Sequence, residues 1–411
     1  MECPRTTPWG ALGNRDAERR PPTEEAEAFW EAARPWLAAE GVTLYDLRYA
    51  EPHHGIKTWC PPPTSFSSAL PFAKTIRDTS DTPRRVLSTR RIAHGQDSAG
   101  RDVLVKIISK SSSERDINEY LLSRVECSKP DSFPSVLAPS AIIDTSHDYA
   151  FLVMPLWTGG LSLERHLSRV DLLLTFIRCV LTGLVYLHEH RIAHRDIREE
   201  NILLNFCFPD LHETQIVDTL EEHLRDATGV VFCLADFDLS LQVPRDTSLR
   251  NCRRSSDESR CGFPLFHPYD TLLGEPYYNP FAYDVACLGK LLIYSFTDAV
   301  PTVPFLAPLF AKMTTHVIHE RFTAAEALQF FKNMSSGMSA EGMARSLTLE
   351  CRFSNLDNPD SYWSKLSAAD RLRWRQYETP AKPWTRRALE WMTSSRFGWA
   401  VVSAVRRTLS V

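Results

Sequence analysis

Eight residues near the middle of the chain, HRDIREEN at positions 194–201, combine the side chains that a phosphoryl-transfer reaction needs. Asp196 can accept a proton from a hydroxyl nucleophile, and Arg198 can neutralise negative charge on a phosphoryl group in transit. Asn201 offers a carbonyl oxygen, a ligand type that suits a hard cation such as Mg²⁺. The spacing therefore indicates a site that positions a hydroxyl, a phosphoryl group and a metal ion together.

The segments around this stretch predict the elements that would position it. Residues 170–190 are typical of a long buried helix that leads into the loop, and ILLN, from Ile202, is typical of a short strand that leads out of it. Upstream, two β-rich runs flank the turn GQDSAG and predict an antiparallel hairpin, whose second strand, VLVKII, carries Lys106. SSSERDINEYLLSRV predicts a helix with a serine cap, and DYAFLVMPLW a buried strand. A small β-rich unit therefore precedes a larger helical unit.

The composition is that of an ordinary globular protein. The 411 residues carry a net charge of −4 and are 43% hydrophobic, so no global field draws the chain to nucleic acid. The ten cysteines include no CxxC pair, which argues against a zinc module or a disulfide framework. The N-terminus lacks an apolar signal core, and the apolar stretch from Val170 to Leu187 is interrupted by Asp171 and Arg178. We therefore expect an intracellular protein, cytoplasmic or nuclear, with no nucleic-acid partner and no transmembrane segment.

Six blocks, in the same order along the chain, resemble the motifs of the protein kinase superfamily. HRDIREEN is similar to the catalytic loop, VLVK to the strand that carries the phosphate-binding lysine, and ADFD to the metal-binding DFG motif. INEYLL looks like the helix of the small lobe, YDVACLGKLL like the central helix of the large lobe, and RFTAAEALQFF like its last helix. The resemblance covers residues 84–334 and implies a two-lobed α+β fold, with a small antiparallel β-rich lobe and a mainly helical lobe. The N-terminal FWEAARPWLAAEG also resembles the flank of a group of fungal kinase-like proteins.

The resemblance to protein kinases implies a role for each site residue. Lys106 would bind the phosphates of ATP, and Glu119 would hold Lys106 through an ion pair. Asp196 would act as the base, and Arg198 would stabilise the transferred phosphoryl group. Asp284 would brace the backbone of the catalytic loop. The cofactor ligands would be Asn201 and Asp236 for Mg²⁺ and, for ATP, Lys106, Met154, Leu156, Leu203 and Asp236.

One further role has two candidates. Arg321 resembles the arginine that pairs with a carboxylate at the end of the activation segment. Asp270 and Glu275 both fit that carboxylate, and the sequence does not choose between them.

Four features depart from the kinase pattern. No GxGxxG lies upstream of Lys106, although glycines normally let backbone amides approach the phosphates. Leu104 stands where kinases place a small residue against adenine, and Asp238 replaces the glycine of DFG. The segment between Asn201 and Asp236 is longer than usual, which predicts an insertion near residues 206–229.

These features leave three functions open. We expect a protein kinase that transfers the γ-phosphoryl group of ATP to Ser or Thr hydroxyls of a protein substrate, because the lysine, the base and both metal-binding residues are all present. A pseudokinase that acts as a binding or scaffold module is the main alternative, supported by the missing glycines, Leu104 and Asp238. A small-molecule kinase of the same fold is the third possibility, since the substrate contacts are not legible in the sequence.

Composition divides the chain into five parts. Residues from position 24 onwards have a helical rhythm, whereas the residues before it are rich in Pro, Arg and Glu. The predicted parts are a disordered N-terminus at 1–23, a helical flank with a Pro-rich loop at 24–83, the small lobe at 84–157, the large lobe at 158–334, and a helical tail at 335–411.

The tail is basic and rich in tryptophan. From Ser361 onwards it holds ten Lys or Arg residues against three Asp or Glu residues, and five of the ten tryptophans of the chain. We expect the tail to dock on the large lobe or on an acidic partner. Trp384 and Trp391 are seven residues apart, which predicts that both lie on one buried helix face.

Overall fold

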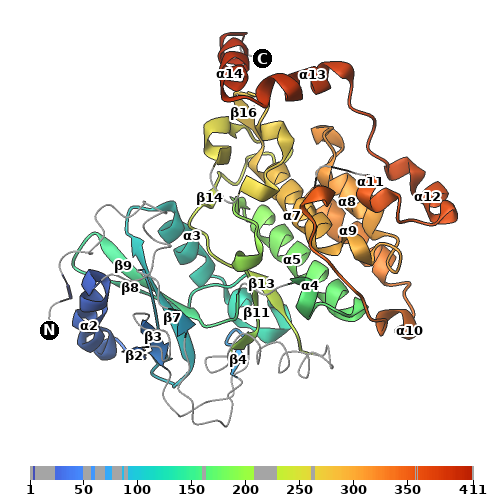
Figure 1. Cartoon of the computed structure of the whole chain (residues 1–411). Coiled ribbons are helices and arrows are strands. Elements are labelled where there is room, and N and C mark those ends of the chain that lie inside the picture. The colour runs from blue at the N-terminus through green and yellow to red at the C-terminus, as the bar shows by residue number, and fades with distance from the viewer. Residues whose placement is uncertain are drawn as a thin grey trace. The chain divides into compact units, whose positions relative to one another are not determined.

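The computed structural model describes the larger part of the chain and divides it into two compact units (Figure 1). The first unit comprises Met1–Gly159 and Leu203–Ala235, and the second comprises Gly160–Ile202 and Asp236–Val411. The described residues are 3–4, 24–49, 57–60, 70–75, 86–87, 91–159, 163–207, 229–260, 264–356, 358 and 360–409.

A five-stranded antiparallel sheet forms the centre of the first unit. Its strand order is β1-β6-β7-β9-β8, and every neighbouring pair is antiparallel. β1 pairs with β6, so the sheet takes its edge strand from the segment that the sequence assigns to the N-terminal flank. The strands are β1 (Val42–Leu44), β6 (Ile92–Asp97), β7 (Asp102–Ser109), β8 (Ala141–Asp144) and β9 (Tyr149–Pro155).

The two faces of this sheet are covered differently. On β7, Val103, Val105 and Ile107 join one buried cluster with residues of α2 (Glu24–Ala39), whose Phe29 and Trp30 pack against the aromatic rings of β9. Because side chains alternate along a strand, Leu104, Lys106 and Ile108 point to the opposite face. The N-terminal helix thus closes one face of the sheet (Figure 1) and leaves the face with Lys106 for the site.

Short elements complete the first unit. The helix α3 (Ser113–Leu122) follows β7 after one turn, and its first turn is capped by the Ser112 side chain, which accepts from the Arg115 amide. A small sheet has the order β2-β3-β5, β11 pairs with β13, and β12 pairs in parallel with β4. These strands are β2 (Asp46–Tyr49), β3 (Lys57–Cys60), β4 (Lys74–Thr75), β5 (Val86–Leu87), β11 (Ile202–Leu204), β12 (Phe206–Cys207) and β13 (Phe232–Leu234).

The second unit is mainly helical. Its core is α7, which is buried along almost its whole length and packs on α8, while α5 packs on α9. Two short strand pairs, β10 with β14 and β15 with β16, lie between the helices. The elements are α4 (Leu163–His166), α5 (Val170–Glu189), β10 (Ile192–Ala193), β14 (Leu241–Gln242), β15 (Arg254–Ser255), β16 (Tyr277–Tyr278), α7 (Pro280–Phe296), α8 (Leu306–Thr314), α9 (Ala324–Ser335), α10 (Ala340–Met343), α11 (Asp360–Trp363), α12 (Ala368–Trp374), α13 (Trp384–Thr393) and α14 (Arg396–Leu409).

The described architecture confirms the predicted α+β fold with a small antiparallel sheet and a larger helical part. Among the described residues, α5 is the one helix long and apolar enough to cross a membrane, and 72% of its apolar window is buried inside the protein, as expected for a core helix. Most of the predicted disordered segment 1–23 and of the predicted insertion 206–229 lies outside the described residues.

The tail packs in part against the helical unit. Trp363 and Trp374 are buried, and the Trp374 ring contacts that of Phe330 on α9. The prediction that Trp384 and Trp391 share a buried face is wrong, because the two side chains are 79% and 78% exposed. A spacing of seven places both on one face of α13, but that face is turned to solvent.

Candidate functional site

Lys106 forms a buried ion pair in the first unit. It lies on β7, directly opposite Leu152 of β9 and Ile92 of β6. Its Nζ donates a hydrogen bond of 2.6 Å to Oε1 of Glu114, and both side chains are buried. Glu114 is in the first turn of α3, where the exposed amides of the helix favour a carboxylate. The N-terminus of α3 thus stabilises the Glu114 carboxylate, and this carboxylate holds the ammonium group of Lys106 in place.

The prediction that Glu119 is the partner of Lys106 is therefore wrong. The Glu119 side chain is 65% exposed, and its nearest cation is Arg115, at 4.0 Å. INEYLL contains Glu119, but α3 starts at Ser113, only four residues after β7 ends, so Glu114 is the carboxylate in its first turn. The buried residues Glu114, Ile117, Asn118 and Leu121 recur at helical spacing, and this pattern in the sequence would have identified Glu114.

The HRD loop of the second unit is braced by one buried carboxylate, as predicted. Asp284 on α7 accepts from the amides of His194 and Arg195, at 2.7 Å each, and lies 3.1 Å from Nε2 of His188. The Ser240 hydroxyl donates to the carbonyl of His194. Asp284 and Ser240 thus hold the loop backbone from two separate segments, and His188 in turn contacts Asp284.

Asp196 and Asn201 are brought together by this loop. The Nδ2 of Asn201 donates to the backbone carbonyl of Asp196 at 2.9 Å and to its Oδ2 at 3.1 Å. The amide of Asp196 in turn donates to Nδ1 of His194. With Nδ2 used in this way, the carbonyl oxygen of Asn201 is the atom that would face a metal.

Two residues of this region adopt the left-handed backbone conformation. The φ angle is 69° at Arg195 and 64° at Asp236, and neither residue is a glycine. Such conformations cost free energy and concentrate at functional sites, where the surroundings enforce them. At Arg195 the surroundings include the Asp284 carboxylate and the backbone carbonyl of Glu258, to which the guanidinium donates.

Arg198 is held by a neighbouring carboxylate. Its Nε and Nη2 donate to the two carboxylate oxygens of Glu200, at 2.7 and 2.5 Å. The hydrogen bond to Glu200 is the main reason that the pKa of Arg198 is raised, and the charges of Asp196 and Asp236 add to the effect. Arg198 therefore lies within electrostatic reach of both predicted site carboxylates.

The Mg²⁺ site predicted at Asn201 and Asp236 has a plausible donor set. A carbonyl and a carboxylate oxygen are ligands that Mg²⁺ accepts, and this ion usually keeps waters and phosphate oxygens as its other ligands. No group of three or more His, Cys, Asp or Glu side chains suited to a metal occurs among the described residues. The site thus fits an ion that arrives with a phosphate ligand better than a permanent structural ion.

The predicted adenine-binding residues lie on one apolar surface of the first unit. Leu104 is directly opposite Met154 in the β7–β9 pair, so both point to one face. Leu156 belongs to a buried cluster against which Leu104 and Leu203 pack. Ala235, the first residue of ADFD, is in the same cluster. The structure therefore brings these four predicted positions, Met154, Leu156, Leu203 and Leu104, to neighbouring places.

A segment that sequence reasoning missed shares this surface. Residues 70–75, here called the strap, lie in the long connection between β1 and β6. Ala73 is a buried member of the cluster that contains Leu156, and Leu70 packs against it. The Nε1 of Trp157 donates to the carbonyl of Pro71 at 2.8 Å, and the amide of Lys74 to the carbonyl of Asn205 at 2.9 Å.

The structure also selects the partner of Arg321. Its guanidinium contacts Asp270, with Nη2 at 2.9 Å from Oδ1, and this ion pair is largely buried. The Arg321 charge helps to lower the pKa of Asp270, against the opposing effect of burial. Glu275, the other candidate, instead pairs with Arg406 of α14 at 2.8 Å.

Comparisons with known proteins agree with the fold. A model of the protein kinase domain matches residues 92–336, more than half of the chain. The chain belongs to the protein kinase family.

Its curated relatives include Ser/Thr kinases at low identity. Calcium-dependent protein kinase 4 of Plasmodium falciparum (isolate 3D7) is 27% identical over 257 residues, which cover 58% of this chain and 46% of that protein. Myosin light chain kinase A of Dictyostelium discoideum is 28% identical over 167 residues, covering 39% and 47%. Testis-specific serine/threonine-protein kinase 2 of Mus musculus is 26% identical over 205 residues, covering 49% and 50%. The chain thus spans at most half the length of these three relatives.

Proposed function

We propose that this chain is a protein kinase that transfers the γ-phosphoryl group of ATP to Ser or Thr hydroxyls of a protein substrate. The observation that carries the proposal is the buried contact between Lys106 and Glu114, at 2.6 Å. Protein kinases require an ion pair between these two positions to hold the phosphates of ATP. A buried charge pair is no efficient way to stabilise a fold, so a nucleotide role accounts for it better than stability does.

The residues of the second unit supply the remaining functions. Asp196 would orient and deprotonate the substrate hydroxyl, and Asn201 donates to both its backbone carbonyl and its carboxylate. Asn201 and Asp236 would bind Mg²⁺, which supplies positive charge to the phosphates. Arg198 would stabilise the transferred group after Glu200 releases it. ATP and a reducing environment suited to the free cysteines of the described residues are both found inside the cell, so the proposed location is the cytoplasm or the nucleus.

The test is phosphotransfer from labelled ATP to a Ser, Thr and Tyr peptide mixture, in the presence of Mg²⁺. We expect label on Ser or Thr, a loss of at least 10²-fold for Asp196→Asn, and a comparable loss for Lys106→Met. Glu114→Gln should reduce the rate, while Glu119→Gln, an exposed matched control, should not. Activity that survives Asp196→Asn would refute the assignment of the base.

A pseudokinase is the second candidate, and the strap is the observation that favours it. Leu70 and Ala73 pack on the cluster that contains Leu156, with the bulky Leu104 beside it. If these side chains cover the surface on which adenine would bind, ATP would be excluded. The protein would then act as a binding or scaffold module instead of transferring phosphate.

Titration of ATP into the wild type and into Trp157→Phe, which loses the hydrogen bond to Pro71, separates the two candidates. Binding by the wild type supports the kinase. Binding by the variant alone supports a site that the strap keeps closed.

A further inference from the structure

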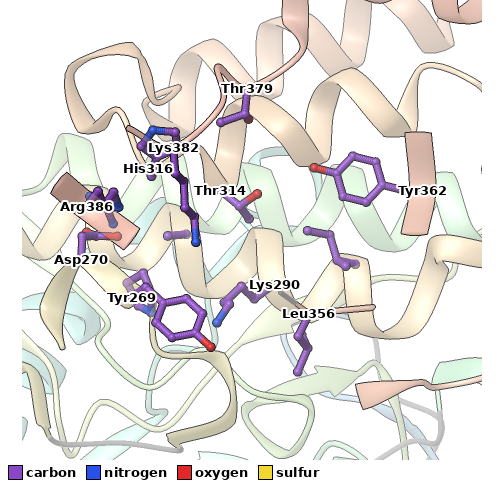
Figure 2. Close-up of a pocket in the computed structure, with 13 residues that line it drawn as sticks. Tyr269, Asp270, Lys290, Thr314, His316, Leu356, Tyr362, Thr379, Lys382 and Arg386 are labelled. Carbon is purple, nitrogen blue, oxygen red and sulfur yellow. The ribbon is translucent and has the colours of Figure 1, made fainter. Parts of the chain in front are cut away.

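A cavity of about 90 Å³ lies in the second unit, and none of the residues 194–201 lines it (Figure 2). Its walls come from α7, from the segment around Asp270, from the end of α8 and from the tail. Figure 2 shows Lys382 and Arg386 of the tail on one side and Tyr269 and Lys290 on the other. The cavity therefore exists only where the tail is folded onto the helical unit.

The cavity is rich in positive charge. Lys290, Lys382 and Arg386 line it, and His316 is a fourth basic group in the wall. Asp270 is the carboxylate in the wall, and it is already paired with Arg321.

One more carboxylate lies nearby. Glu390 lies 3.0 Å from Lys382 and 3.2 Å from Arg386, so a single carboxylate serves two cations. Together with Arg321, which pairs with Asp270, the described residues place four permanent cations and two carboxylates in or beside this cavity.

Two of the ammonium groups gather around one aromatic ring. The Nζ of Lys290 lies 5.0 Å from the centre of the Tyr269 ring, and the Nζ of Lys382 lies 5.3 Å from it. Lys290 is 8% exposed and donates to the carbonyl of His267 at 2.9 Å. The pKa of His316 is lowered, first by burial and then by the charges of Arg386 and Lys382. Lys290 is buried whereas the Lys382 side chain is 36% exposed, and two like charges held this close repel each other unless an anion joins them.

We propose that this cavity binds a small phosphate-type oxyanion, held by Lys290, Lys382 and Arg386. Its volume of about 90 Å³ is several times the space that one water molecule needs, so the cavity has room for a phosphoryl group. Arginine and lysine are the residues that bind phosphate oxygens most strongly. The bound anion would tie the tail to the segment that carries Asp270, on which Arg321 depends.

The test is calorimetric titration of inorganic phosphate into the full chain at constant ionic strength. We expect saturable binding that weakens about tenfold in Lys382→Gln and in Arg386→Gln, the loss typical of one charged hydrogen bond. Glu390→Gln is a matched control with the opposite expected effect. It removes the carboxylate that competes with the anion for Lys382 and Arg386, and it should therefore tighten phosphate binding. Lys106→Met should leave binding unchanged, since its site is in the other unit.

A second arm identifies the source of the anion. Glycerol 2-phosphate replaces inorganic phosphate in the same titration. Tighter binding of the ester points to a phosphorylated ligand, and tighter binding of phosphate to the free ion. Either result supports the site. Binding that disappears in Lys106→Met but persists in Lys382→Gln would overturn the proposal, as would an equal response to chloride.

Discussion

Removal of the Glu114 carboxylate gives the sharpest test of how the Lys106 site is built. The Glu114 side chain is 3% exposed and that of Lys106 is 11% exposed, so Glu114→Ala leaves an ammonium buried without its carboxylate. Breaking a buried pair in this way costs about 3–5 kcal/mol. For a unit of this size each kcal/mol shifts the Tm by roughly 2–4 °C, so we expect a fall of about 6–20 °C.

Two further variants separate the ion pair from other effects of the mutation. Glu119→Ala removes an exposed carboxylate 4.0 Å from Arg115, and an exposed pair is worth about 0–1 kcal/mol. The double variant Lys106→Met/Glu114→Leu removes both charges and should recover most of the lost stability, since apolar replacements of a buried pair are often neutral. It should nevertheless fail to bind ATP.

Urea unfolding followed by circular dichroism measures all three variants against the wild type, with ATP titration as the second readout. The refuting result is a Glu119→Ala variant that loses as much stability as Glu114→Ala. A neutral Glu114→Ala variant would equally show that the contact between Lys106 and Glu114 does not form in solution.

Three other perturbations test parts of the structure independently. His94 is buried, and burial lowers its pKa to about 3, so below pH 6.5 the unfolded chain binds a proton that the folded chain does not bind. The free energy of unfolding should therefore fall by about 1.4 kcal/mol per pH unit from pH 6.5 towards pH 3. Unfolding curves measured over a series of pH values should show a weaker pH dependence of this free energy for His94→Leu. The Oδ1 of the buried Asn118 has no hydrogen-bond partner among the described residues, so Asn118→Leu should raise the urea midpoint by an amount equivalent to about 1 kcal/mol, and a lower midpoint would contradict this. Glu200→Gln should release Arg198 and tighten binding of Mg²⁺-ATP several-fold; an unchanged dissociation constant would show that Arg198 does not reach the phosphates.

The parts of the site that sequence predicted well are those set by local spacing. In HRDIREEN the positions of Asp196 and Asn201 are separated by one short loop, and the structure brings the two side chains into contact. The pattern VLVKII likewise predicted a strand that carries Lys106, because alternation along a strand is a local property. The brace by Asp284 came from the resemblance to kinases, and the structure confirms it.

The parts that sequence could not predict depend on packing between distant segments. Asp270 and Glu275 both precede α7, and the sequence gives no reason to prefer one of them as the partner of Arg321. In the structure Arg406 of α14 pairs with Glu275, and Arg321 pairs with Asp270. In the strap, Ala73 packs in one cluster with Leu156, which is far away along the chain. The residue pattern around Ala73 and the pattern around Leu156 do not predict this contact. In contrast, Glu114 could have been found, because its spacing to the buried face of α3 is local.

The missing glycines and the strap are two aspects of one change in the first unit. Residues 45–91 connect β1 to β6, and part of this connection is fixed by the bonds from Trp157 to Pro71 and from Lys74 to Asn205. A glycine loop binds phosphates through backbone amides that approach them closely, and a segment that is anchored at Trp157 and at Asn205 cannot close in that manner. The strap offers apolar side chains instead. Nucleotide bound by this chain would therefore depend on Lys106 for its phosphate contacts more than in a kinase with the glycine loop, and Lys106 depends in turn on Glu114.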